Sequence, residues 1–221
     1  MSTDQLPTDL GVLYAAARRR ITGLVAAALD DLPVPATPEW TVHDVVAHLR
    51  GIVEDGIGGN MDGAPGEAWT AAQVQRGASK TTAQLLDEWN EQAPMFETFL
   101  SSPSGNMVGA AVMDVHTHEA DLRNALGHTA AVPEAFLEWA APQLLDGFAD
   151  AVAAAGLPPV TVEAPAFEVF RARLGRRTEA EVTAYSWSAD PAPYLDAWFI
   201  FGRRTESLGE GSLGEGLLND R

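Results

Sequence analysis

The stretch VMDVHTHEADLRNAL, residues 112–126, brings carboxylates and histidines close together in the chain. In a helix each residue advances ~100°, so side chains four or seven positions apart return to within ~40° of each other. Asp114, His118 and Asp121 would therefore share one helix face, whereas His116 would point roughly away from it. Carboxylates and imidazoles are ligands of divalent metals. An acidic helix with a solvated polar face would show the same pattern, so both interpretations stay open at this point.

A further candidate ligand lies on an earlier predicted helix, residues 41–57 (TVHDVVAHLRGIVEDGI). Thr41 is the predicted N-cap, with Asp44 as its partner in an analogue of the capping box. His43 and His48 are five residues apart, about 140° around a helix, so they cannot both face the interior. His48 lies on the apolar side. A lone histidine there is more often a core residue with a hydrogen-bond partner than a ligand, and spacing alone does not decide between the two.

The elements that would position these residues are predicted to be the helices of a bundle. Apolar residues recur at helical period, and caps and breakers divide the chain. The glycine-rich residues 56–78 contain few aliphatic side chains and are predicted to be a loop with at most a short turn. Four helices with one long crossover loop are typical of a four-helix bundle, whose sites are built from core-facing side chains. The expected helices are one after an N-cap at Thr8, the helix over 41–57, one over 80–100, and one over 107–126 that ends at Gly127.

The residues after the bundle are predicted to form a small α+β appendage. A fifth helix follows Pro133, PPVTVEA resembles a short strand, and PAFEVFRARLG and TEAEVTAYSW resemble short helices. The aromatic segment PYLDAWFIFG must pack on something. The fold class is therefore mainly α, with a bundle domain over 8–130 and a fifth helix and appendage over 131–205. The glycine-rich repeat SLGEGSLGEG predicts a disordered tail over 206–221.

Composition excludes several classes of function. The net charge of −17 disfavours nucleic acid and anionic membranes, because both would be repelled over most of the surface. The chain has no cysteine, so any thiol chemistry would have to use an external thiol. The N-terminus lacks the pattern of a signal peptide, and the apolar runs are too short to span a bilayer. A cytoplasmic location is therefore predicted.

Two segments together resemble a known family. WTVHDVVAHL (Trp40–Leu49), followed by DVHTHEADLRNALG (Asp114–Gly127), is similar to the mycothiol-dependent maleylpyruvate isomerase family. That family belongs to the DinB-like, or YfiT-like, group of metal-binding four-helix bundles. The resemblance covers residues 10–128. The segment from FRARLGRRTEAEV to FIFG is similar to the tail of actinobacterial members.

The resemblance implies a divalent metal, usually zinc, held by His48, Asp114 and His118. It departs from the family at one ligand, because the usual acid is glutamate and Asp114 is one methylene shorter. Asp121 would suit the role of orienting a ligating imidazole through its distal N–H, although a solvated helix-face acid is an equal alternative. Trp40 and Trp89 are predicted to be packing residues. No catalytic or cofactor-binding residue is assigned.

Two functions from different classes follow from these observations. The first is an enzyme that uses a metal and the small-molecule thiol mycothiol, either as a cis–trans isomerase or as an S-transferase onto an electrophilic or unsaturated substrate. The second is a non-catalytic bundle that binds a small ligand or a protein partner, and the substitution of Asp114 for glutamate slightly favours it. The aromatic run near the C-terminus would allow a homodimer in either case.

Overall fold

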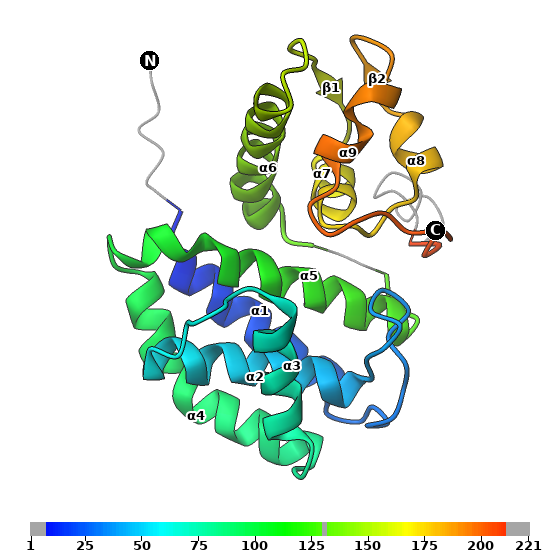
Figure 1. Ribbon diagram of the computed structural model, residues 1–221. Helices are drawn as coiled ribbons and strands as arrows, with labels where there is room; N and C mark the ends of the chain where they lie inside the picture. The colour runs from blue at the N-terminus through cyan, green and yellow to red at the C-terminus, as the bar shows by residue number, and fades with distance from the viewer. Residues whose placement is uncertain (1–7, 130–131, 211–221) are drawn as a thin grey trace. The chain divides into compact units, whose positions relative to one another are not determined.

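The computed structural model describes residues 8–129 and 132–210 of the 221-residue chain. The chain divides into two compact units, Met1–His128 and Thr129–Arg221. Most described residues are helical, and the short strands within these ranges lie in the second unit (Figure 1). The predicted mainly α fold, a helical bundle with a small appendage, is therefore confirmed. The domain boundary predicted at residue 130 falls outside the described residues.

Four long helices form the frame of the N-terminal unit. They are α1 (Leu10–Val25), α2 (Val42–Gly58), α4 (Thr82–Leu100) and α5 (Gly109–Ala125), and a short 3₁₀ turn, η1 (Gly105–Val108), precedes α5. The helix α1 packs against both α4 and α5, and α2 packs mainly against α4 and approaches α5 less closely (Figure 1). Within the described ranges, no helix combines the length and the apolar character needed to cross a membrane.

The starts of the helices follow from their capping residues. The capping box predicted for α2 is present: the Thr41 hydroxyl oxygen accepts from the Asp44 backbone N–H, and the Thr41 backbone N–H donates to Asp44 Oδ2 at 2.9 Å. The N-cap predicted for α1 at Thr8 is wrong by one residue. The cap is Asp9, whose Oδ1 accepts from the backbone N–H of Val12 at 3.1 Å.

The bundle core contains an aromatic cluster that confirms the packing role predicted for Trp89. Its side chain is fully buried, and its Nε1–H donates to the Tyr14 hydroxyl at 3.2 Å. Tyr14 also meets Phe96 edge to face, with ring centroids 5.4 Å apart. Burial raises the pKa of Tyr14 well above its usual value, so this hydroxyl stays neutral and serves as a hydrogen-bonding core group.

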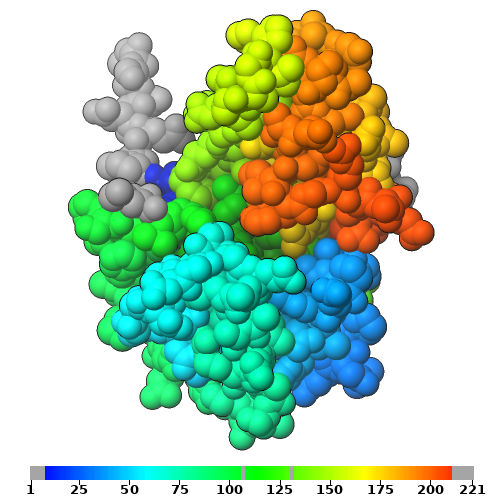
Figure 2. Space-filling model, in the orientation of Figure 1, coloured from blue at the N-terminus to red at the C-terminus, as the bar shows by residue number. Residues whose placement is uncertain are grey.

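The loop predicted over residues 56–78 is wrong, because it contains the helix α3 (Glu67–Gly77). This helix lacks an apolar stripe: its buried residues are Gln73 and Gly77. It instead packs on α2 through small residues, and a Cβ added to Gly51 would lie only 2.6 Å from Gln73 Cβ. In Figure 2, α3 and the loop before it (cyan to teal) form an outer face of the N-terminal unit and cover α2 in this view.

The C-terminal unit places short elements beside one long helix. These are α6 (Glu134–Ala154), β1 (Val162–Glu163), α7 (Ala166–Arg173), α8 (Glu179–Thr183), β2 (Ser186–Trp187), η2 (Ala192–Tyr194) and α9 (Leu195–Trp198). The two strands pair antiparallel. The predicted aromatic segment does pack: Trp198 is fully buried and contacts Phe148 with ring centroids 5.0 Å apart. The same segment leaves Ile200 and Phe201 exposed.

The predicted tail over 206–221 is only partly described, since 211–221 lies outside the described residues. Its described part ends in Glu210, whose carboxylate is fully buried. The Arg171 guanidinium donates two hydrogen bonds to it, at 2.9 and 2.5 Å, and Arg177 donates a third at 2.8 Å. Residues 206–210 therefore take part in the packing of this unit.

Candidate metal centre

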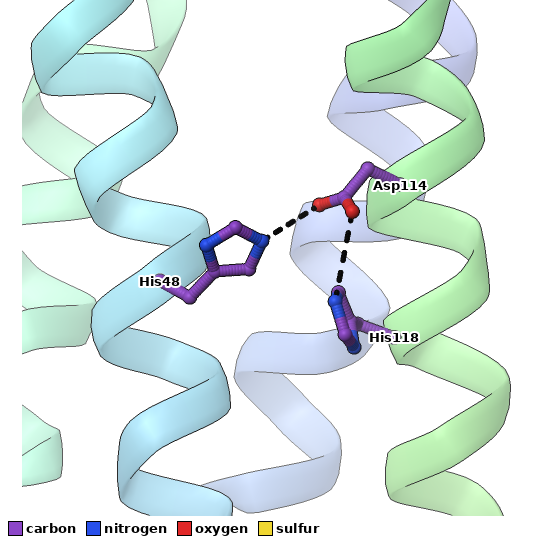
Figure 3. Close-up of side chains that lie close together, drawn as sticks. All are labelled: His48, Asp114 and His118. Atoms are coloured by element: carbon purple, nitrogen blue, oxygen red, sulfur yellow. Dashed lines mark ion pairs between the residues drawn. The ribbon is translucent and has the colours of Figure 1, made fainter. Parts of the chain in front are cut away.

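Three predicted ligands, carried by α2 and α5, meet inside the N-terminal unit. His48 Nε2 lies 3.3 Å from Asp114 Oδ2, and His118 Nε2 lies 3.6 Å from Asp114 Oδ1. One ligand atom from each of the three residues lies within 4.8 Å of the other two. Figure 3 shows His48 reaching from α2 towards α5, with Asp114 and His118 one turn apart on α5.

The spacing of these atoms fits a single cation. Two ligands ~2.1 Å from a tetrahedral zinc ion lie about 3.4 Å apart, close to the two separations found here. The Asp114 carboxylate thus lies close to both imidazoles, although it is one methylene shorter than the glutamate that the resemblance implies. The donor set of two imidazole nitrogens and a carboxylate suits zinc or a similar divalent metal.

The two histidines of the site are buried, and Asp114 is partly exposed. The side chains of His48 and His118 are 5% and 6% exposed, whereas that of Asp114 is 32% exposed. A cation held here would have three protein ligands. A tetrahedral ion would then keep one coordination position for another ligand, as catalytic metal sites do.

Asp121 lies behind His118, in the position that the first of its two alternative roles requires. Its Oδ2 is 3.2 Å from His118 Nδ1, and its side chain is fully buried. It is therefore not the solvated acid of the alternative interpretation. A carboxylate beside Nδ1 favours a proton on that nitrogen and leaves Nε2 free to bind a cation.

Sequence reasoning missed Gln73, which has the corresponding position behind His48. Gln73 Oε1 lies 2.7 Å from His48 Nδ1, and Gln73 Nε2 donates to Asp55 Oδ2 at 2.8 Å. Gln73 is fully buried. No apolar periodicity marks α3, so the sequence held no helical signal that would have turned this side chain towards α2.

Because α3 lies so close to α2, we expect that a side chain at Gly51 would lower the stability. Gly51→Ala is expected to destabilise the N-terminal unit by about 1–3 kcal/mol, because its Cβ would overlap Gln73 Cβ and also crowd the Gln73 backbone. The helix-propensity gain of up to ~1 kcal/mol would not offset this overlap. The measurement is urea unfolding followed by circular dichroism.

Gly23→Ala is the matched control for this substitution. Gly23 lies inside α1, and a Cβ there meets nothing within 4 Å. This variant is expected to be about 0.5–1 kcal/mol more stable than the wild type. Equal effects at Gly51 and Gly23 would show that the space between α2 and α3 does not require glycine.

Trp40 lies nearer to the site than its predicted packing role implied. Its ring centroid is 5.1 Å from that of His48 and 5.7 Å from that of His118. The ring is partly buried. It thus packs directly on both imidazoles and limits their rotation.

The other histidines of the bundle do not join the site. His43 Nε2 lies 2.8 Å from the Lys80 carbonyl oxygen, and His116 Nδ1 lies 2.8 Å from the Val112 carbonyl oxygen. His116 is buried away from the ligands, as its helical position predicted, and burial lowers its pKa to about 4. A histidine at that position is neutral at physiological pH.

Two arginines, one directly after the first motif and one inside the second, are paired with carboxylates. Arg50 contacts Glu54 at 2.6 Å and Glu88 at 2.9 Å, and Arg123 contacts Glu119 at 3.0 Å. Both arginines therefore have structural partners within the bundle. Neither is identified as a group that binds a substrate carboxylate.

The fold and the site together define a helical bundle with a candidate metal centre between two of its helices. Residues 14–123 match the family described as "Mycothiol maleylpyruvate isomerase N-terminal domain", and the N-terminal unit belongs to this family. All three candidate ligands, with Gln73 and Asp121, lie within the matched residues. No curated protein and no solved structure matched the chain in the corresponding comparisons.

Proposed function

We propose that the chain is a metal-dependent enzyme that uses mycothiol as a cofactor. His48, Asp114 and His118 would hold the metal, with zinc the best match to the donor set. Asp121 would orient His118 through Nδ1. The observation that carries this proposal is the convergence of three ligand atoms, two imidazole nitrogens and a carboxylate oxygen, within 4.8 Å of one another.

A divalent cation in this position would lower the pKa of a bound thiol and so favour the thiolate at neutral pH. The chain itself contributes the ligands, the anchoring of both imidazoles and a largely water-excluded side behind them. It supplies no thiol, since it contains no cysteine. The family supplies the candidate for this thiol, which is mycothiol.

The reaction we propose is cis–trans isomerisation of an activated double bond or, on another electrophile, S-transfer. In isomerisation the thiolate sulfur bonds to one alkene carbon, and the electron pair of the double bond moves onto the adjacent carbonyl. The resulting single bond rotates. The electron pair then returns from the carbonyl and re-forms the double bond as the carbon–sulfur bond breaks, and the thiolate leaves unchanged. In S-transfer the carbon–sulfur bond stays in the product and the thiol is consumed. Addition to a double bond ends when the enolate takes up a proton, and substitution ends when the leaving group departs with its bonding electron pair.

Metal content is the first test of the proposal. The protein, purified without a nickel column, is expected to contain about one equivalent of zinc or a similar metal. The metal is measured by inductively coupled plasma mass spectrometry. Metal-free wild-type protein at neutral pH that shows no change in stability on addition of zinc would end the proposal.

Mycothiol binding is the second test, and the absence of cysteine makes it a clean one. Any thiol that stays with the protein through gel filtration must come from the ligand, so a thiol reagent counts it without background. Mycothiol is expected to raise the melting temperature of the metal-loaded protein and to leave that of the chelator-treated protein unchanged. Equal stabilisation with and without metal would favour a non-catalytic bundle.

The same thiol count separates the two reactions. With maleylpyruvate, the substrate that the family name gives, an isomerase changes the absorbance of the substrate while the free thiol stays constant. An S-transferase lowers the free thiol in step with the product. If neither the absorbance nor the free thiol changed, catalysis on this substrate would be contradicted.

A further inference from the structure

We infer that Gln73 is a positioning residue that holds His48 in a single tautomer, with the proton on Nδ1 and the lone pair of Nε2 facing Asp114. The inference rests on the proposed metal site. It adds that the chain prepares one of its ligands before any metal binds, through a side chain from α3.

The orientation of the Gln73 amide is fixed by Asp55. The carboxylate of Asp55 accepts from Gln73 Nε2 at 2.8 Å, from Asn60 Nδ2 at 2.9 Å and from Arg76 Nη2 at 2.7 Å. Burial alone would raise the pKa of Asp55, but these hydrogen bonds outweigh burial and lower the pKa below its usual value. An ionised carboxylate only accepts hydrogen bonds, so the NH₂ group of Gln73 must face it.

The Gln73 oxygen must then face His48, and an oxygen at 2.7 Å from Nδ1 requires that nitrogen to be the donor. Nε2 of the neutral ring therefore carries no hydrogen. It lies 3.3 Å from Asp114 Oδ2, so a lone pair faces a carboxylate oxygen across the position where the cation is proposed. A cation between these two acceptors would be stabilised by both.

The opposite tautomer is disfavoured by the same network. A proton on Nε2 could be donated to Asp114, but Nδ1 and Gln73 Oε1 would then be two acceptors 2.7 Å apart. Turning the amide over would repair this contact and place Gln73 Oε1 against Asp55 instead. Each alternative leaves a poorly matched polar group in a buried place, which is unfavourable.

Packing keeps the Gln73 side chain between His48 and Asp55. Its side chain is fully buried, and its Cβ lies where a side chain on Gly51 would have to be. The absence of a side chain at Gly51 thus allows α3 to come close enough to α2 for the short hydrogen bond to His48. The helix that the sequence did not reveal is the element that orients a ligand.

The experiment records the tautomer in metal-free protein. Full-length chain labelled with ¹⁵N-histidine is treated with a chelator and examined by long-range ¹H–¹⁵N spectra at mildly alkaline pH, with His48→Ala to assign the signal. The wild type is expected to show Nδ1–H on His48. Gln73→Met is expected to shift His48 towards Nε2–H, because Asp114 is then the remaining hydrogen-bond acceptor for the ring.

The same variant is expected to bind zinc about 10–100-fold more weakly, measured by competition with a fluorescent chelator. Gln75→Met is the matched control, since Gln75 is exposed on the same helix and should change neither the tautomer nor the affinity. Asp55→Asn is the second variant: an amide at position 55 can face either end of Gln73, so His48 should show both tautomers.

An Nε2–H signal for His48 in the wild type would overturn the inference, and so would a folded Gln73→Met variant that keeps the Nδ1–H tautomer. The wild-type spectrum decides the matter even if a variant does not fold. Because these spectra are taken without metal, failure of the wild type to bind zinc would contradict the proposed function and leave the tautomer result to be judged separately.

Discussion

A chain in which His118 is replaced by alanine is expected to lose its bound metal and keep its fold. The substitution removes one of three ligand atoms, and two protein ligands cannot hold the ion as tightly as three. The effect should exceed the 10–100-fold loss of affinity that is typical for removal of an outer partner of a ligand. Metal content after gel filtration and the circular dichroism spectrum measure the two expectations.

His128→Ala is the control variant for His118→Ala. His128 is exposed at the end of the N-terminal unit and has no part in the candidate site, so its removal should leave the metal content unchanged. Because a bound metal also stabilises the folded state, the melting temperature of His118→Ala should be compared with that of metal-free wild type. Retention of a full equivalent of metal by folded His118→Ala would show that the ion binds elsewhere.

The face shared by the residues on α5 could be predicted because it depends only on helical geometry. Asp114, His118 and Asp121 are four and three residues apart, and they do lie together. The capping box at Thr41 likewise depends on residues three apart. Local spacing of this kind is a property of the sequence, so within a helix it does not depend on how the rest of the chain packs.

Contacts between distant segments could not be predicted in the same way. Spacing gave no reason for His48 to meet α5, and only the resemblance to the family pointed to it. The position of Gln73 was missed altogether, because α3 packs through Gly51 and Gly77 and lacks the apolar stripe that marks a helix in sequence. Polar interactions between distant segments produce no periodic pattern in the sequence.

The C-terminal segment is a second case in which a contact between distant residues could not be predicted from the sequence. A substitution in this segment is also expected to have a large effect. Its glycine-rich composition predicted disorder, yet Glu210 reaches a fully buried place between Arg171 and Arg177. Arg177 also pairs with Glu168 at 2.7 Å, and Tyr185 donates to Glu168 at 2.9 Å. Among the described residues, Arg171, Arg177, Glu168 and Glu210 thus form a hydrogen-bonded network inside the C-terminal unit.

Glu210→Ala is expected to destabilise the C-terminal unit by about 3–5 kcal/mol. The loss is large because the substitution leaves Arg171 buried without this carboxylate and removes one of the two acids paired with Arg177. The measurement is urea unfolding of the full chain followed by tryptophan fluorescence, to which each of the two units contributes three of the six tryptophans.

The control is Glu206→Ala, which removes the same charge from an exposed position of the same segment. It should change the stability by no more than about 0.5 kcal/mol. If Glu210→Ala behaved like Glu206→Ala, the ion pairs of Glu210 would contribute little to the fold, and residues 206–210 would belong with the tail that the composition predicted. A large loss at Glu210 alone would extend the folded unit to that residue, because a single buried charge would then hold an otherwise exposed segment in place.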